Sequence, residues 1–311
     1  PVTSEDCLTL SVYTTDMTAR KPVHVFIHGG GFNNGGKGIT RGWPWELDDM
    51  VYVAINYRLG PFGYMALDEF MEESGTSGNF GTLDQILALK WIRANIHSFG
   101  GDPDTVVVVG ESAGGRSLET LVASPLAHGL FVRGISISGY AAVEGGFAVY
   151  TSSRSVRTGL AAQNARNDPV YRSQVYREEL KTQLGISESG KPLLSRLRGL
   201  PVDVLLRYMD EVVSNRLVTV PLEDGYVLPT NWKERPSSVP LLITNTLRED
   251  ALYALLTNYT EIWQASLTTE DGALLNHLYG NPTTPEEMFE AGIDSASDDW
   301  MSGQYRYAQL L

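Results

Sequence analysis

A run of five β-branched residues that ends in a glycine turn constrains the fold more than any other feature of this chain. Residues 105–115 are TVVVVGESAGG, so a threonine and four valines lead directly into a turn with Ser112 at its tip. Strands that are apolar and β-branched throughout are typical of parallel sheets covered by helices on both faces. The next residues, GRSLETLVA (115–123), favour a helix that begins just after Ser112. The stretch therefore predicts an α/β fold with a serine at a strand-to-helix turn.

The rest of the chain alternates strands and helices in the same way. We expect further buried strands at PVHVFI (22–27), VYVAINY (51–57), GISIS (134–138) and PLLITN (240–245). A helix is expected over 83–96, where one face would comprise Leu83, Ile86, Leu87, Lys90, Trp91 and Ala94. This alternation favours a mostly parallel central sheet flanked by helices.

The region from about 150 to 235 is helical in pattern and charged, as in YREELKTQLG. It predicts a helical insertion that covers the ends of the strands, where ligands of such sheets bind. The length of 311 residues and an apolar content of 42% suit one large domain with a substantial core. We therefore expect a single domain over 1–311.

Composition excludes several classes of partner. The net charge of −13 would repel phosphate backbones and anionic lipid head groups, so we expect neither nucleic acid nor a membrane surface as a partner. No stretch approaches the roughly 20 continuous apolar residues that cross a bilayer. Cys7 is the single cysteine, so no disulfide can form within these residues, and a buried inert thiol is its simplest interpretation.

Two glycine-rich motifs carry the candidate chemistry. Residues 110–114 fit G-x-S-x-G, in which the tight turn leaves no room for side chains two positions either side of the serine. The alternative is a serine in an ordinary glycine turn, and the flanking strand and helix favour the first interpretation. HGGGF (28–32) follows a predicted strand, and its bare N–H groups can point at the oxyanion of a tetrahedral intermediate. A flexible turn is the other possibility, while neither common nucleotide-binding glycine motif fits 29–38.

Several longer stretches resemble one family over nearly the whole chain. They are SEDCLTLSVYT (4–14), HGGGF (28–32), INYRLGPFGYMAL (55–67), residues 78–115, SPLAHGLF (124–131), SISG (136–139) and PLEDGYVLP (221–229). By these motifs the chain resembles the type B carboxylesterases, the cholinesterase-like branch of the α/β-hydrolases. The resemblance implies an α/β-hydrolase fold and cleavage of small carboxylic esters through an acyl-enzyme, with no metal and no cofactor.

The resemblance also implies a role for particular residues. Ser112 would be the nucleophile, and the backbone N–H groups of Gly30, Gly31 and Ala113 would form the oxyanion hole. Around them, Glu111 and Ser138 would tune the site, and Glu5 and Arg58 would form a structural pair.

The acid of the triad is expected in LLITNTLREDALY (241–253), which matches the family's strand, polar turn and acid. An ungapped match places Asp250 at the acid position, with Glu249 beside it as the alternative. Both could instead be carboxylates at a helix N-terminus, where acids are commonly stabilised.

The base of the triad should be a histidine that follows the acid in the sequence. The expected order is serine, acid, histidine, and only His277 follows Asp250. Its context, GALLNHLYG, predicts a helix that ends at a glycine, whereas the family's base stands in a loop with an H-G pattern absent here. The resemblance further implies that Cys7 pairs with a cysteine upstream of residue 1. We therefore expect that the chain is incomplete at both termini and that the catalytic histidine lies outside it.

Three functional classes remain from the sequence. The first is a serine esterase, the second an esterase-like adhesion or binding protein without catalysis, and the third an inactive fragment. The intact serine turn and glycine loop favour the first, and the absent histidine favours the other two. The acidic charge, the unpaired Cys7 and the sequon Asn258-Tyr259-Thr260 favour secretion. The oligomeric state is not predicted.

Overall fold

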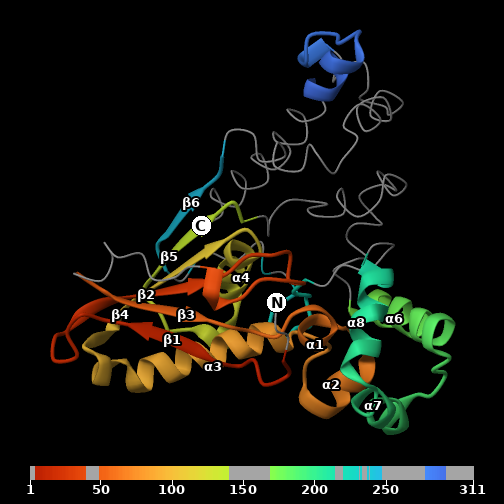
Figure 1. Cartoon of the computed structure of the whole chain (residues 1–311), viewed down its shortest axis with the longest axis horizontal. Coiled ribbons are helices and arrows are strands. Elements are labelled where there is room, and N and C mark those ends of the chain that lie inside the picture. Colours follow the sequence, from red (N-terminus) through yellow and green to blue (C-terminus); the bar gives the residue numbers. More distant parts are fainter. Residues whose placement is uncertain are drawn as a thin grey trace.

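A computed structural model of the chain describes residues 4–39, 49–139, 169–213, 220–230, 232, 237, 239–246 and 277–291. Within these residues the central feature is a six-stranded sheet in the order β1-β3-β2-β4-β5-β6 (Figure 1). Its strands are β1 (Leu10–Tyr13), β2 (Lys21–Ile27), β3 (Val51–Ile55), β4 (Gly101–Glu111), β5 (Arg133–Ile137) and β6 (Leu241–Thr244). The strand β1 is antiparallel to β3, and every other pair is parallel, which confirms the predicted α/β-hydrolase architecture.

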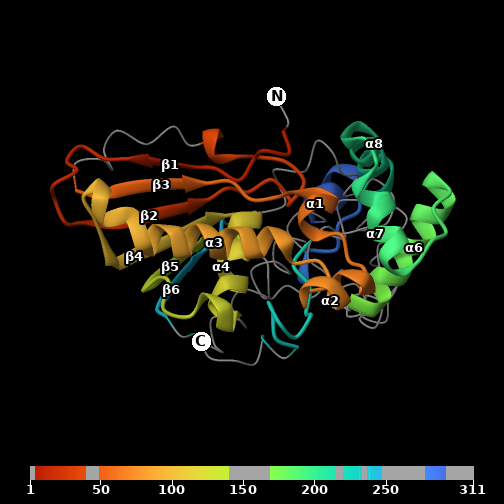
Figure 2. The same cartoon turned by 90° about the horizontal axis from the view of Figure 1, so that it is seen from below.

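The helices α3 (Phe80–Asn95) and α4 (Ala113–Ala123) lie side by side on one face of the sheet (Figure 2). A buried hydrogen bond of 2.9 Å joins them, from Gln85 Nε2 on α3 to Ser117 Oγ on α4. Beneath them, every residue of β3 is buried, and both valines of β2 and two valines of β4, Val106 and Val108, belong to the same apolar core. The sheet and α4 therefore hold the serine turn between rigid elements.

The predicted face of α3 is wrong by about one position. Leu87 and Trp91 are 61% and 38% exposed, whereas Ile86, Leu89 and Ile92 are buried. The physical reason is that the buried face of this helix also carries polar groups, which an apolar periodicity does not register. Asp84 and Gln85 are both buried there, where Arg58 donates to the Asp84 carboxylate and the Gln85 amide nitrogen donates to Ser117.

Arg58 forms its ion pair with Asp84 and not with Glu5, which corrects the expected structural pair. The guanidinium donates from Nε and Nη2 to the two carboxylate oxygens at 2.8 Å each. The backbone N–H of Arg58 adds a third bond of 3.0 Å to the same carboxylate. This bidentate pair ties the chain just after β3 to the first turns of α3.

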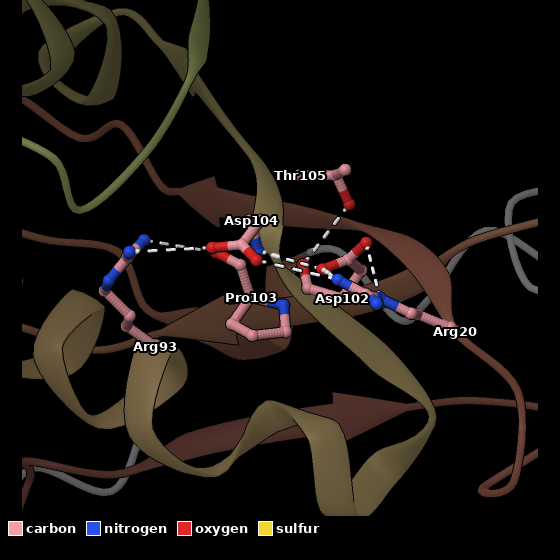
Figure 3. A network of polar contacts seen from close by, with 6 residues as sticks. All are labelled: Arg20, Arg93, Asp102, Pro103, Asp104 and Thr105. Atoms are coloured by element: carbon pink, nitrogen blue, oxygen red, sulfur yellow. Dashed lines mark hydrogen bonds and ion pairs between the residues drawn. The ribbon is translucent and has the colours of Figure 1, made fainter.

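An exposed charge network lies at the start of β4, at the end of the sheet away from Ser112 (Figure 3). Arg20, which precedes β2, contacts Asp102 at 2.9 Å and Asp104 at 3.6 Å. Arg93 of α3 contacts Asp104 at 3.5 Å. The network joins the amino-terminal ends of β2 and β4 to α3.

A group of helices lies beyond the carboxyl ends of the parallel strands in both views (Figures 1 and 2). It comprises α1 (Gly60–Tyr64), α2 (Asp68–Ser74), α6 (Pro169–Leu184), α7 (Gly190–Arg198) and α8 (Val202–Val213). Apolar residues of α6 and α7 pack with Met65, Ala66 and Leu67, which follow α1. The helical character expected for the insertion is thus confirmed over 169–213. The prediction of one domain over 1–311 stays a prediction.

Charged contacts also attach the insertion to α2. Glu69, which is buried, accepts from Arg177 of α6 at 2.6 Å and from the backbone N–H of Gly190, at the start of α7, at 2.9 Å. Arg198 of α7 pairs with Glu73 through both of its terminal nitrogens. These contacts hold the insertion next to the strand ends that carry the candidate site.

Candidate active site

Ser112 stands at a strained turn between β4 and α4. Its φ of 56° and ψ of −120° lie where a residue with a side chain is seldom found. The backbone N–H of Ser112 donates to the carbonyl of Ile137 at 2.8 Å, so the neighbouring strand β5 helps to hold the turn. Strain of this kind persists only where the surrounding structure enforces it, and it is common at functional sites.

The glycines two positions either side of Ser112 are required by close backbone contact. A Cβ on Gly110 would lie 2.0 Å from the carbonyl oxygen of Gly114. A Cβ on Gly114 would lie 2.0 Å from the carbonyl oxygen of Ile27, at the end of β2. Both distances are far below van der Waals contact, so the steric reason inferred from the motif is confirmed.

The glycine loop after β2 lies against this turn. Ile27 and Gly110 are register partners in the parallel pair β2 and β4, so residues 28–32 and 110–114 leave the sheet at the same level. A Cβ on Gly29 would be 3.0 Å from the Cβ of Ser112. Gly30 and Gly31 have φ values of 113° and 60°, which favour glycine and turn the chain sharply just after Gly29. The structure therefore brings together the two motifs that carry the expected nucleophile and oxyanion hole.

Glu111 and Ser138 lie at the ends of neighbouring strands. Glu111 is the last residue of β4, and its Oε2 is 2.7 Å from where a Cβ on Gly29 would be, so its carboxylate lies over the glycine loop. Ser138 follows β5 with a φ of 51°, and its N–H donates to the carbonyl of Thr244 at 2.7 Å. Both residues border the turn that carries Ser112.

Sequence reasoning missed the polar contacts that support Ala113, the first residue of α4. Ser117 Oγ donates to the carbonyl of Ala113 at 2.9 Å and accepts from Gln85 at 2.9 Å. All three residues are fully buried. The apolar periodicity of a helix gives no signal for such residues, because their burial depends on a partner elsewhere in the chain.

The candidate acid lies outside the described residues, since neither Asp250 nor Glu249 is among them. His277 is described, and it is an exposed residue whose carbonyl accepts from Gly280, where the turn ends. This agrees with the expected helix end at a glycine. Figure 1 places the segment 277–291 well away from the sheet and from α4.

Cys7 is half-buried, and burial is the main reason that the pKa of its thiol is raised. Within the described residues, no three His, Cys, Asp or Glu side chains gather closely enough to bind a metal ion. Each helix in those residues is too short or too polar to cross a membrane.

A mostly parallel sheet with a serine turn after a central strand and a glycine loop after its neighbour defines the α/β-hydrolase class of protein. The match to the model of the carboxylesterase family extends over residues 2–300. This chain therefore belongs to the carboxylesterase family.

Individual relatives agree with this assignment. The chain is 35% identical over 280 residues to carboxylesterase 1E of Rattus norvegicus, a match that covers 80% of this chain and 48% of that protein. It is 46% identical over 149 residues to the para-nitrobenzyl esterase of Bacillus subtilis (strain 168), covering 45% of this chain and 29% of that protein. The chain thus spans less than half the length of both curated relatives.

Solved structures give the same result for the fold. A structure of a PNB esterase superposes with a TM-score of 0.71 at 32% identity, covering 99% of this chain and 63% of that one. A carboxylesterase from Geobacillus stearothermophilus gives a TM-score of 0.73 at 28% identity, with the same coverage.

Proposed function

We propose that the protein that carries this chain hydrolyses small carboxylic esters through an acyl-enzyme on Ser112. One observation supports this most: Ser112 is held at a positive φ between two glycines that admit no Cβ, directly against the glycine loop. An adhesion or binding protein has no physical need for such a turn. The names of the relatives, which are esterases, support the same chemistry.

In the proposed reaction, Ser112 Oγ attacks the ester carbonyl and its proton passes to a general base. The carbonyl oxygen becomes an oxyanion, which accepts from the N–H groups of Gly30, Gly31 and Ala113. Collapse of this intermediate breaks the ester bond and releases the alcohol, which takes up the proton. Water then attacks the acyl-enzyme by the same route and releases the carboxylic acid.

We propose Asp250 as the acid that orients the base, with Glu249 as the alternative. We propose none of the five histidines as the base itself. His24 is on β2, the His28 ring contacts the carbonyl of Gly29, His97 and His128 are exposed, and His277 lies in the separate segment 277–291. Because the chain spans less than half the length of both curated relatives, kinetic tests use the full-length protein that carries it.

The test of the nucleophile compares Ser112→Ala with Ser98→Ala, an exposed serine beyond α3. We expect Ser112→Ala to abolish both hydrolysis of a p-nitrophenyl ester and labelling by a fluorophosphonate probe, and Ser98→Ala to change neither. Substantial turnover by Ser112→Ala would show that another residue is the nucleophile. A folded wild-type protein that the probe does not label would contradict the esterase proposal altogether.

The acid is tested separately. Asp250→Asn should lower kcat by about 10⁴-fold, because an amide cannot stabilise the imidazolium. A full effect from Glu249→Gln with none from Asp250→Asn would move the assignment by one residue.

We also propose that the protein is secreted, on the basis of its acidic charge and the sequon at Asn258. A loss of mass on treatment with an N-glycosidase would support this. A native protein without glycan at Asn258 would remove the principal argument for it.

A further inference from the structure

The direction of each candidate oxyanion-hole donor is set by the carbonyl in the same peptide unit. In a trans peptide the C=O and the following N–H point in opposite directions within one plane. The N–H groups of Gly30, Gly31 and Ala113 therefore point away from the carbonyls of Gly29, Gly30 and Ser112. Whatever holds these carbonyls also holds the donors in place.

Two of the three carbonyls are held by backbone groups. The carbonyl of Gly30 accepts from the N–H groups of Asn33 and Asn34 at 3.1 Å each. The carbonyl of Ser112 accepts from the N–H of Arg116 at 3.0 Å, as the first bond of α4. Backbone bonds of this kind form for almost any sequence that adopts the loop and the helix.

The third carbonyl, that of Gly29, has a side-chain partner. His28 Nδ1 lies 2.8 Å from it. A carbonyl oxygen can only accept, so Nδ1 carries the proton in this bond. Burial lowers the pKa of His28, which favours a neutral ring whose single proton is on Nδ1. The ring is also confined, because a Cβ on Gly35 would lie 2.5 Å from the same nitrogen.

Tyr57 fixes the His28 ring. The two rings are stacked with centroids 4.5 Å apart and an angle of 18° between their planes. The Tyr57 hydroxyl donates to the carbonyl of His28 at 2.9 Å. Since both side chains are almost completely buried, solvent does not compete for these bonds. Tyr57 thus holds the peptide before the one that His28 holds.

We propose that His28 and Tyr57 are positioning residues for ester hydrolysis, which hold the Gly29–Gly30 peptide so that the Gly30 N–H faces the developing oxyanion. This inference rests on the proposed function. A leucine or phenylalanine at position 28 would fill the same volume, but it could not hold the carbonyl of Gly29. Without that bond the peptide can rotate, and one donor of the oxyanion hole is misdirected.

The strands β2 and β3, which lead to His28 and Tyr57, supply a matched control. His24 of β2 and Tyr52 of β3 are register partners, with ring centroids 5.2 Å apart in an edge-to-face contact. This pair lies earlier on β2 and β3 than His28 and Tyr57 do, further from the carboxyl ends of the strands. Its replacement should therefore perturb packing without reaching the oxyanion hole.

The experiment measures kcat and KM for a p-nitrophenyl ester, together with inhibition by a trifluoromethyl ketone, whose adduct with serine carries an oxyanion. We expect His28→Leu to lower kcat by about 10²-fold, the loss typical for one oxyanion donor, with KM changed by less than about 3-fold. Affinity for the ketone should fall in parallel with kcat. Asn supplies an amide N–H close to the position of Nδ1, so His28→Asn should recover about 10-fold of the loss. Tyr57→Phe should lower kcat by about 5-fold through the lost hydroxyl alone.

The controls are His24→Leu and Tyr52→Phe, with Tm recorded for every variant. They should leave kcat within about 3-fold of wild type even where Tm falls. Equal kcat losses in His28→Leu and His24→Leu, or no recovery with His28→Asn, would overturn the inference while leaving the esterase proposal intact. A wild-type protein without Ser112-dependent hydrolysis would overturn both.

Discussion

Substituting Gly114 with alanine tests the geometry of the serine turn most directly. The new Cβ would lie 2.0 Å from the carbonyl oxygen of Ile27 and 2.8 Å from its carbon. Carbon and oxygen normally approach no closer than about 3.3 Å, so α4 or the end of β2 must move by about 1 Å. Both are backbone elements within the buried core, and neither can yield as a surface side chain would. Overpacking of this kind costs about 1–3 kcal/mol, and we expect the upper part of that range.

The displacement also falls between Ser112 and the glycine loop. A misplacement of about 1 Å at a catalytic group can reduce activity by about 10²-fold, so Gly114→Ala should lose that much in kcat/KM. The control is Gly38→Ala, because a Cβ there would have no heavy atom within 4 Å and its φ is ordinary. Urea unfolding and hydrolysis of a p-nitrophenyl ester supply the two measurements. If Gly114→Ala matched Gly38→Ala in both, the contact with β2 would not be what requires glycine.

Three further predictions concern stability. Arg58→Leu removes the guanidinium that pairs with the buried carboxylate of Asp84, and it should lower the free energy of unfolding by about 1–3 kcal/mol. Arg20→Leu, at an exposed pair, should change the free energy of unfolding by less than about 1 kcal/mol. Urea unfolding measures both, and equal losses would contradict the argument from burial. Burial lowers the pKa of His24 to about 4, so its contribution is complete above pH 6.5 and is lost as the pH falls towards 4. Wild type should therefore lose up to about 3 kcal/mol more than His24→Phe over that interval, and parallel pH profiles would refute the argument. Glu69→Gln should speed proteolysis within α6 and α7 several-fold relative to Glu72→Gln, an exposed neighbour, because Glu69 accepts one hydrogen bond from each of these helices. Equal cleavage rates would show that apolar packing alone holds the helices in place.

The parts of the fold that the sequence predicts well are the buried parallel strands. The valine run of β4 and the segments that became β2 and β5 are apolar because helices and neighbouring strands enclose them, so composition alone reveals them. The strand β1 was missed because it is an edge strand whose four residues are all half-buried, which leaves no alternation to detect. Its antiparallel pairing with β3 joins two segments that are far apart in the sequence, and no local pattern encodes such a pairing.

The candidate site was predictable for a different reason. G-x-S-x-G and HGGGF are easily recognised because each places its requirements on a few consecutive residues: a positive φ at Ser112, and glycines where backbones meet. Side chains that support such motifs from elsewhere in the chain carry no comparable pattern. Tyr57 follows β3 at a position that looks like ordinary core, and only the fold places its hydroxyl on the carbonyl of His28. Gln85 was equally hidden within a helix assigned from its apolar residues.

The two glycine motifs also depend on one another, which their separation in sequence conceals. Gly29 is required because a Cβ there would meet the backbone of Glu111 at 2.8 Å and Ser112 at 3.0 Å, while Gly114 is required by the carbonyl of Ile27. Each motif therefore supplies a glycine to admit the backbone of the other. The parallel register of β2 and β4 brings the carboxyl ends of the two strands to the same level. The contacts between the two motifs then fix the distance between the serine and the loop. All of these contacts lie within residues 27–29 and 111–114, so the proposed nucleophile and the glycine loop proposed as the oxyanion hole form one unit.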